Sequence, residues 1–235
     1  MKIGIIGAMA VEVQMLKDIM QNMNMATISG IEYYSGTISG VEVVVAQAGI
    51  GKVNAAVCTE AMILKYEPAA VINIGVAGGL SGNLKVGDIA IADTVVEHDM
   101  DTSVFGDPIG FITGINLVNI PCAQWVTEML LEVAKKIDGV NTLCGTIVSG
   151  DQFISSKEKK LQLVERFNAV ATEMEGASIG HVCYMNGVPF GVLRAISDSA
   201  DDEADMSFNE FCDMAAKNSS RVILNFLEIV KEKKI

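Results

Sequence analysis

Three carboxylic acids in this sequence, Glu12, Glu175 and Asp198, stand where each could donate or accept a proton. Glu12 and Asp198 each follow an apolar run that predicts a strand. In open α/β sheets the carboxyl ends of the strands face the ligand crevice, so an acid there has an aqueous cleft beside it and apolar walls around it. Each acid taken singly also fits an ordinary helix-terminal or turn carboxylate. Their convergence on one rim of a sheet favours an active site.

The segments around the last two acids predict the elements that would position them. Pro189–Ile196 is apolar except for Arg194, which indicates a strand buried on both faces of a mainly parallel sheet. Glu175–Met185 has small residues followed by apolar positions at helical spacing. This pattern places Glu175 in the first turn of a helix, near the edge of the sheet.

The rest of the chain alternates between predicted strands and helices. Lys2–Ile6 is a β-branched run, and Val11–Met20 follows it with helical spacing, so Glu12 falls in a first helical turn. The alternation, without repeats or linkers, predicts a single α/β domain over residues 1–235, with three α/β/α layers and a central mixed, mainly parallel twisted sheet. Ser207 with Glu210 predicts a capping box for a C-terminal helix. The other predicted strands are Glu32–Ile38, Val41–Gln47, Ala69–Ile74, Asp88–Ala92, Thr142–Val148 and Ala169–Ala171, and the other helices are Gln124–Ile137, Ser156–Phe167 and one ending near Tyr66.

Two glycine-rich turns raise the question of a bound phosphate. Gly75–Gly82, GVAGGLSG, lets the backbone approach a ligand closely, but the pattern is not GxGxxG and a dinucleotide is not implied. Gly51-Lys52 imitates the end of a Walker loop, yet that loop needs glycine where this chain has Ala46 and Ser or Thr where it has Val53. The Walker motif is therefore rejected.

Aromatic residues mark two further segments. Phe153 follows a strand end, where it could stack on a flat ligand or make a satellite core contact. The polar, glycine-broken segment Glu97–Gly114 carries Phe105 and Phe111. A long loop of this kind is typical of a lid or an interface, and a plain surface excursion is the alternative.

Composition excludes several classes of protein. Seventeen basic against 29 acidic residues give a net charge of −12, so nucleic-acid binding is not expected. Five scattered cysteines with no CxxC pair predict reduced core residues of a cytosolic protein. The two histidines belong to no metal-binding motif, so no metal is expected. No stretch approaches the roughly 18 apolar residues of a membrane span.

Seven segments occur in order along the chain: KIGIIGAM, AGIGKVNAA, NIGVAGGL, KVGDI, SGDQFI, EMEGASIGHVC and RAISDSAD. In order and spacing they resemble the 5′-methylthioadenosine/S-adenosylhomocysteine nucleosidases, a branch of the purine nucleoside phosphorylase superfamily. The resemblance implies a nucleoside phosphorylase-like fold and hydrolysis of the N-glycosidic bond of methylthioadenosine, S-adenosylhomocysteine and 5′-deoxyadenosine. It also implies a cytoplasmic homodimer without a cofactor, serving methionine salvage.

The resemblance further implies a role for each site residue. Asp198 matches the general acid that protonates N7 of adenine, Glu12 the residue that activates water, and Glu175 the ligand of the ribose hydroxyls. Arg194 matches a fourth catalytic residue, near the water and Glu12. The implied substrate-binding residues are Met9, Ile50, Val76, Ala77, Gly78, Phe153, Ile154, Glu173, Met174, Glu175 and Phe208, with Phe105 supplied by the partner subunit.

Elementary chemistry explains why such a reaction needs three acids. Adenine is a poor leaving group as an anion, so an acid with a raised pKa must protonate it as the bond breaks. The sugar becomes an oxocarbenium-like cation, which nearby carboxylates stabilise. Water must attack from the opposite face, as in inverting glycosidases.

Departures from the family pattern keep three alternatives in view. Val76 replaces a serine or threonine that phosphorylase relatives use on phosphate, and Ala10-Val11 replace acids common before Glu12. A purine nucleoside phosphorylase would need a cationic phosphate cradle, so Val76 and Glu12 argue against it.

Asp107 and the GFITG stretch leave the preference for the 5′ substituent open, so a hydrolase of aminodeoxyfutalosine is the second alternative. A nucleoside-binding sensor without catalysis is the third alternative.

Overall fold

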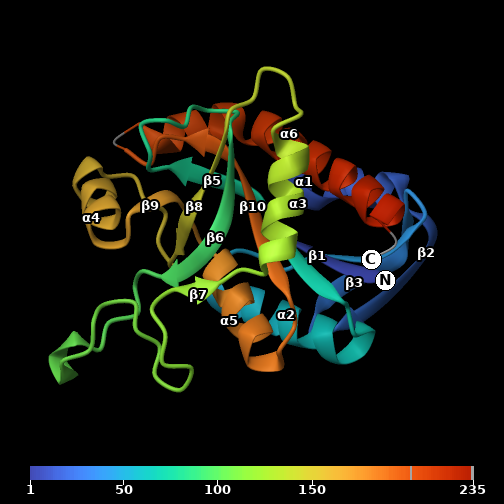
Figure 1. Cartoon of the computed structure of the whole chain (residues 1–235), viewed down its shortest axis with the longest axis horizontal. Coiled ribbons are helices and arrows are strands. Elements are labelled where there is room, and N and C mark those ends of the chain that lie inside the picture. The colour runs from blue at the N-terminus through green and yellow to red at the C-terminus, as the bar shows by residue number, and fades with distance from the viewer. Residues whose placement is uncertain (202, 234–235) are drawn as a thin grey trace.

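The computed structural model describes residues 1–201 and 203–233, which form a mixed α/β fold around one sheet (Figure 1). Ten strands occur in these residues, in the order β10-β6-β8-β9-β5-β1-β4-β3-β2, with β7 paired to β6. The strands are β1 Lys2–Gly7, β2 Gln21–Ile28, β3 Ile31–Ile38, β4 Val41–Gln47, β5 Ala70–Gly79, β6 Ile89–Glu97, β7 Ile120–Pro121, β8 Thr142–Ser149, β9 Ala169–Glu173 and β10 Phe190–Asp198.

Helices cover both faces of this sheet, which confirms the predicted three-layer arrangement (Figure 1). One face packs against α1, α3 and α6, and the other packs against α2 and α5. The short α4 packs beside β8 and β9. The helices are α1 Ala10–Ile19, α2 Lys52–Tyr66, α3 Gln124–Ala134, α4 Lys157–Phe167, α5 Gly176–Asn186 and α6 Ala204–Lys233, with a 3₁₀ turn η1 at Ser103–Phe105.

The strand sequences explain how both helical layers are anchored. Along β4, Val43 and Val45 join the core beneath α1 and α6, whereas Val44 and Ala46 join the core beneath α2 and α5. Alternate side chains of a strand point to opposite faces, so an unbroken apolar run fills both layers.

Pairing around β5 brings the predicted site residues to one edge. β5 lies parallel to β1 on one side and to β10 on the other, while the outer strands β3 and β2 add antiparallel pairs. At its carboxyl end, Gly78 of β5 pairs with Asp198 of β10 and with Thr172 of β9. The site is therefore built on neighbouring strands rather than on free loops.

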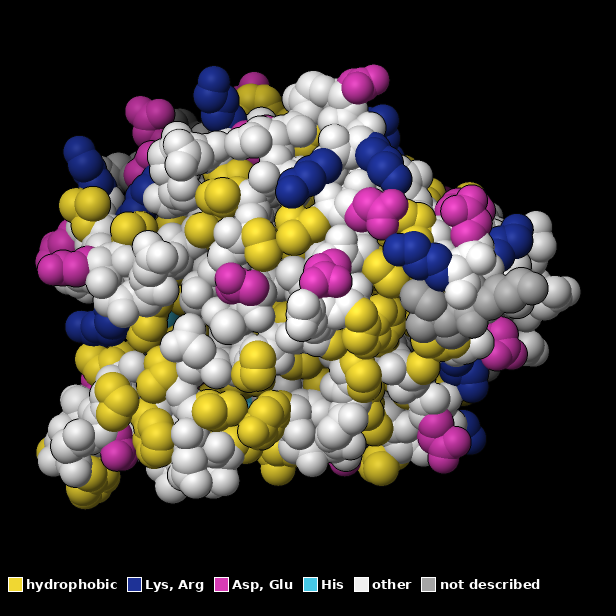
Figure 2. Space-filling view, viewed as in Figure 1, with side chains coloured by type: hydrophobic (Ala, Val, Ile, Leu, Met, Phe, Trp, Pro, Cys, Tyr) yellow, Lys and Arg dark blue, Asp and Glu magenta, His cyan; other side chains and the backbone are white. Residues whose placement is uncertain are grey.

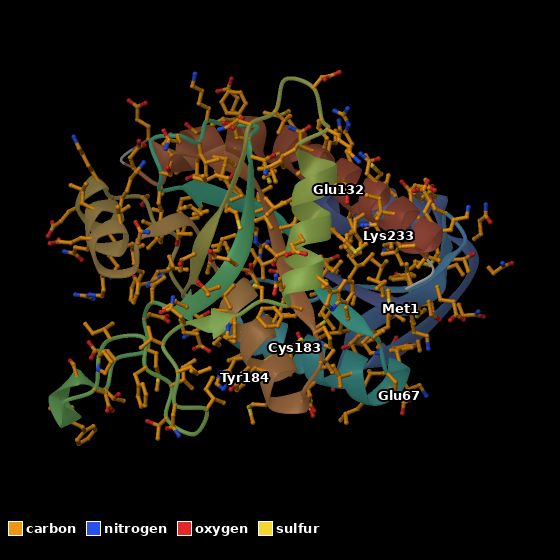
Figure 3. The ribbon with its side chains drawn as sticks, in the orientation of Figure 1. Met1, Glu67, Glu132, Cys183, Tyr184 and Lys233 are labelled. Atoms are coloured by element: carbon orange, nitrogen blue, oxygen red, sulfur yellow. The ribbon has the colours of Figure 1, made fainter. Side chains whose placement is uncertain are left out.

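Side chains on the helices follow the same division between core and solvent (Figure 3). Cys183 of α5 is buried, while the adjacent Tyr184 is exposed. Lys233, near the end of α6, pairs with Glu132 of α3 at 3.3 Å. The five cysteines were predicted to lie in the core, and Cys58 and Cys183 do, whereas Cys122, Cys144 and Cys212 are only partly buried.

Three details differ from the sequence prediction. The C-terminal helix begins at Ala204, so the predicted capping box of Ser207 and Glu210 is wrong, and both residues lie inside the helix. Glu175 is the N-cap of α5 rather than a residue of its first turn. The edge strand β2 escaped prediction because it is mostly exposed and has no apolar run.

The surface carries charges of both signs. On the face seen in Figure 2, Lys and Arg side chains stand among Asp and Glu, with apolar side chains scattered between them. Within the described residues, no helix is both long and apolar enough to cross a membrane.

Candidate active site

A pocket of about 580 Å³, including its open mouth, lies at the carboxyl ends of β1, β5 and β10. A concave, mainly apolar lining with a few polar groups is typical of a small-molecule site. The predicted site residues line it, except Arg194 and Phe105. The pocket is lined by Ala8, Met9, Glu12, Ile50, Val76, Ala77, Gly78, Gln152, Phe153, Ile154, Thr172, Glu173, Met174, Glu175, Ser197, Asp198 and Phe208.

Asp198 is the last residue of β10 and is only 2% exposed. Its Oδ1 accepts a hydrogen bond from the Ala200 amide at 2.8 Å, and its Oδ2 accepts one from the Ser197 hydroxyl at 2.8 Å. Burial raises the pKa of Asp198, although both hydrogen bonds oppose this effect. The raised pKa lets the carboxyl hold a proton closer to neutral pH, as a general acid must.

Glu12 is buried in the first turn of α1. Its Oε2 accepts hydrogen bonds from the amides of Ala8 at 2.7 Å and Met9 at 2.8 Å. Its Oε1 accepts a third from the amide of Val76 at 3.0 Å. Burial raises the pKa of Glu12, while the charge of Arg194 and the three amides lower it. These donors fix the carboxylate between β1 and β5.

Glu175 occupies the other end of the pocket, at the start of α5. Its Oε1 accepts a hydrogen bond from the Gly51 amide at 2.9 Å, and its Oε2 lies 3.6 Å from Nη2 of Arg194. Burial and repulsion from Glu173 raise the pKa of Glu175 to about 7, against the attraction of Arg194. This group therefore titrates near neutral pH.

Arg194 lies beneath the pocket and is fully buried. Its Nη2 donates to Asn73 and to Glu173, and its Nη1 donates to the carbonyl of Ile74 at 3.1 Å. A buried guanidinium needs such partners to offset its desolvation. Arg194 thus supplies one positive charge under the acids and does not border the space that a ligand would fill.

Glu173 borders the pocket, but protein donors already engage both of its oxygens. One accepts from the Ser149 hydroxyl, and the other accepts from Arg194 and from the amides of Glu175 at 3.0 Å and Gly176 at 2.7 Å. The first amides of a helix lack partners within the helix, and an acid at this end satisfies them. Glu173 therefore fixes the start of α5 while it borders the pocket, and the substrate contact expected from the sequence stays a prediction.

Glycines of the GVAGG segment are required because the acids lie so close to the backbone. A Cβ added to Gly75 would lie 2.2 Å from Nη1 of Arg194 and 2.3 Å from Oε1 of Glu12. A Cβ added to Gly78 would lie 2.8 Å from Oδ1 of Asp198. The sequence predicted that this segment lies close to a ligand. In the structure, the missing side chains of Gly75 and Gly78 leave room for the carboxylates of Glu12 and Asp198.

Aromatic side chains form one wall of the pocket. Phe153 and Phe208 meet edge to face, with ring centroids 5.6 Å apart and an interplanar angle of 81°. Phe153 remains 46% exposed and Ile154 is buried beside it. A flat aromatic ligand would find stacking surface here.

Phe105 lies far from this wall within the chain. It ends the 3₁₀ turn η1 in the loop that protrudes from the body of the molecule, drawn in green in Figure 1. Its side chain is 83% exposed. A single chain therefore leaves this predicted site residue outside the pocket.

Four lining residues were not predicted as site residues: Ala8, Gln152, Thr172 and Ser197. Each lies next to a predicted site residue, and all but Thr172, which directly precedes EMEGASIGHVC, lie inside a segment that carried the family resemblance. Extending the prediction to motif neighbours would have found them. Across the described residues, no group of three or more His, Cys, Asp and Glu side chains is arranged to hold a metal ion.

Comparisons with known proteins agree with this geometry. The family described as the phosphorylase superfamily matches residues 2–228. The 5′-methylthioadenosine/S-adenosylhomocysteine nucleosidase of Halalkalibacterium halodurans is 42% identical over 227 residues, covering 95% of this chain and 96% of the relative.

Solved structures give the same result. The 5′-methylthioadenosine/S-adenosylhomocysteine nucleosidase of Neisseria meningitidis, in complex with methylthio-immucillin-A, is 36% identical with a TM-score of 0.93, covering 96% of this chain and 98% of that one. A futalosine hydrolase of Helicobacter pylori is 39% identical with a TM-score of 0.92, covering 97% of both chains. The chain belongs to the phosphorylase superfamily and, within it, to the 5′-methylthioadenosine/S-adenosylhomocysteine nucleosidases, hydrolases that act on N-glycosidic bonds.

Proposed function

We propose that this enzyme uses water to cleave methylthioadenosine and S-adenosylhomocysteine, and also 5′-deoxyadenosine, into adenine and the 5′-substituted ribose. One observation carries the proposal. Three buried acids, Glu12, Glu175 and Asp198, line a single pocket, and burial raises the pKa of each. Family membership supplies the substrate class.

Asp198 is the general acid in this proposal. The departing adenine carries negative charge on its ring, and a proton delivered to N7 neutralises that charge as the bond breaks. The raised pKa of Asp198 suits it to hold that proton, and the Ser197 hydroxyl at 2.8 Å orients the carboxyl. Phe153 and Phe208 would hold the purine between apolar surfaces while it is protonated.

Glu12 activates the attacking water. Three backbone amides hold its carboxylate in one orientation, so a water hydrogen-bonded to it would be aimed in one direction. The positive charge of buried Arg194 favours the ionised form of Glu12. Arg194 thus acts through Glu12 and not by touching the substrate.

Glu175 binds the ribose hydroxyls in its ionised form, with Met174 against the sugar. As the bond breaks, positive charge develops on the ribose, and a desolvated carboxylate nearby stabilises it. Proximity to Glu173 opposes ionisation of Glu175, and developing positive charge on the sugar would relieve that repulsion. The interaction therefore strengthens toward the transition state.

The 5′ substituent would lie between Met9 and Ile50, both on the pocket lining. Ile50 is 54% exposed, so a single chain leaves this end open. A homodimer in which Phe105 of each chain closes the site of the other would cover it. Cytoplasmic methionine salvage is the setting that fits these substrates.

A second candidate is hydrolysis of a futalosine-type nucleoside. The similarity to the Helicobacter pylori futalosine hydrolase favours it, since that protein matches this chain as fully as the nucleosidases do. Such a substrate has a nucleoside end like that of methylthioadenosine. Only the open 5′ end of the pocket would therefore distinguish between the two substrates. A phosphorylase is disfavoured because Val76 offers no hydroxyl to phosphate and Glu12 repels it.

The test measures adenine release from methylthioadenosine, and separately from aminodeoxyfutalosine, in phosphate-free buffer and again with phosphate, for the wild type and for Asp198→Asn. We expect phosphate-independent release, reduced at least about 1,000-fold by the substitution because amide nitrogen cannot supply the acidic proton. Asp138→Asn, at an exposed position that does not line the pocket, is the control and should stay near wild type. Release only with phosphate would assign a phosphorylase, and release from aminodeoxyfutalosine alone would select the second candidate.

A further inference from the structure

The turn between β4 and α2 contacts the site without lining it beyond Ile50. The Gly51 amide donates to Oε1 of Glu175 at 2.9 Å. The next residue is held through both of its backbone groups, because the Lys52 amide donates to Oδ1 of Asp151 at 2.8 Å and the Lys52 carbonyl accepts from the Ser178 hydroxyl at 2.7 Å. The amide that reaches Glu175 is therefore oriented by neighbours outside the pocket.

Gly51 itself shows how demanding this turn is. Its φ of +97° lies in the region that favours glycine, and an added Cβ would lie 3.0 Å from Oδ1 of Asp151. Such a conformation persists only where its surroundings hold it. Asp151 is one such support, since it caps the first amide of α2.

The Lys52 side chain joins this turn to the loop that carries Phe105. Its Nζ lies 2.7 Å from Oδ1 of Asp99 and 3.2 Å from Oε2 of Glu97. The other oxygen of Asp99 accepts from the Asp151 amide at 2.9 Å, and His181 Nδ1 lies 3.0 Å from Glu97. All the groups that face Lys52 are thus parts of one network.

This network differs from an ordinary surface ion pair, which contributes little. The side chains of Lys52, Glu97 and Asp99 are 19%, 12% and 16% exposed, so water screens them poorly. Burial would lower the pKa of Lys52, but its hydrogen bonds with Asp99 and Glu97 outweigh burial and raise it. Burial likewise would raise the pKa of both acids, which their partners nevertheless lower. Lys52, Glu97 and Asp99 are therefore charged at neutral pH.

We propose that Lys52 and Asp151 are positioning residues that hold the Gly51 amide against Glu175. They would fix the acid that binds the ribose while touching no substrate themselves. The consequence for the ribose rests on the proposed function, whereas the effect on Glu175 does not. Asp99 lies at the start of the Phe105 loop, and Asp151 lies two residues before Phe153. The contacts of Asp99 with Lys52 and with the Asp151 amide therefore also fix the starts of the two segments that carry these phenylalanines.

The first experiment measures the pKa of Glu175 by carboxyl ¹³C NMR, with its signal assigned by its loss in Glu175→Gln. Asp151→Ala removes both a negative charge and the cap, and Asp151→Asn removes the charge but keeps the Oδ1 acceptor. Loss of charge alone lowers the pKa of Glu175, whereas loss of the Gly51 hydrogen bond raises it. We expect a higher pKa in Asp151→Ala than in Asp151→Asn. Equal values, or the reverse order, would overturn the proposal.

The second experiment compares kcat/KM for methylthioadenosine with that for its 2′,3′-dideoxy analogue, which lacks the groups that Glu175 would bind. Lys52→Met should lower kcat/KM for the full ribose about 10- to 100-fold, and the loss should shrink to about twofold for the analogue. Lys52→Arg should recover most of the loss. Equal losses on both substrates would show a merely structural effect and refute the proposal. If the wild type cleaves neither substrate, the proposed function fails and the NMR result alone decides the positioning role.

Discussion

The pocket and the Phe105 loop are opposites within one molecule. In the pocket, Glu12 and Asp198 are almost completely buried, and each of their four carboxylate oxygens accepts a hydrogen bond from the protein. In the loop, Val104 and Phe105 are 85% and 83% exposed. The pocket buries carboxylates, which water would solvate favourably, whereas the loop exposes apolar side chains, whose contact with water is unfavourable.

This contrast shows where each region is completed. The acids gain their donors from strand ends of the same chain, so the catalytic half of the site needs no second molecule. The loop is shaped by its own hydrogen bonds, Ser103 amide to Asp101 and Thr102 hydroxyl to Asp107, both at 2.9 Å. A loop that holds its form yet leaves Phe105 in solvent fits a surface that another chain covers.

The largest expected effect comes from breaking the close packing of the pocket. Gly75→Ala would place a methyl group within 2.3 Å of the Glu12 carboxylate and within 2.2 Å of Arg194. We expect kcat/KM to fall about 100-fold or more, since small displacements of a catalytic group are costly, and the free energy of unfolding to fall by about 1–3 kcal/mol. Adenine release and chemical denaturation measure the two effects.

Gly82→Ala is the matched control for that substitution. An added Cβ at Gly82 meets no atom within 4 Å, although the residue belongs to the same glycine-rich segment. Its activity and stability should remain near wild type. If both alanine variants lose activity equally, flexibility of the segment matters and the close approach of the acids does not.

A smaller effect should appear in stability as a function of pH. The folded-state pKa of Glu175, about 7, lies above its usual 4.5. The native state therefore holds this proton more firmly, and the resulting stabilisation is full below pH 4.5 and is lost as pH rises through 7. Between pH 4 and 8 the wild type should lose roughly 3 kcal/mol more than Glu175→Gln does.

Urea denaturation across that pH range measures the difference between the two proteins. Glu175→Gln should become the relatively more stable protein at pH 8 while losing nucleosidase activity, because the charge that destabilises the fold is the one that we propose binds the ribose. Parallel stability curves would contradict the raised pKa of Glu175.

The smallest effect is expected from the loop. Phe105→Ala should leave the free energy of unfolding within about 0.5 kcal/mol of wild type, as for other exposed positions, and raise KM roughly tenfold. Leu161→Ala, an exposed apolar side chain on α4, should change neither quantity. Unchanged substrate affinity in Phe105→Ala would count against a role in the site.

Subunit mixing sharpens this prediction. A heterodimer of Asp198→Asn with Phe105→Ala has one site that combines an intact acid with an intact crossing loop. Mixing the two variants should therefore restore a low KM at one of the two sites of each heterodimer. A KM that stays high after mixing would place Phe105 in the site of its own chain, or in none.

Much of the fold was predictable because local patterns coincide with global ones. Lys2–Ile6 and Pro189–Ile196 are apolar on both faces, and such runs have few stable positions other than the middle of a covered sheet. The same patterns placed Glu12 and Asp198 at strand ends. The edge strand β2 was not predicted because most of its side chains are exposed and give no apolar pattern. The start of α6 was misplaced because helix ends have only weak sequence signals.

The site was predictable only in part. Residue types and order, with the family resemblance, predicted the acids and the aromatic residues that line the pocket, but they could not predict which protein groups surround Glu173 and Arg194. The structure engages the first with four protein donors and buries the second beneath the pocket. Which lone pairs are already occupied depends on partners distant in sequence, such as Ser149.

The sequence by itself determined which elements form and which acids stand at their ends, because strand and helix periodicity and the glycines between them are local properties. Only the tertiary structure decided the charge state of those acids, since burial and the proximity of Glu173 and Arg194 set the pKa of Glu175. It also decided that Gly75 faces Glu12 and that Lys52 reaches Asp99. Desolvation and Coulomb interactions depend on distances through space, and those distances exist only once the chain has folded.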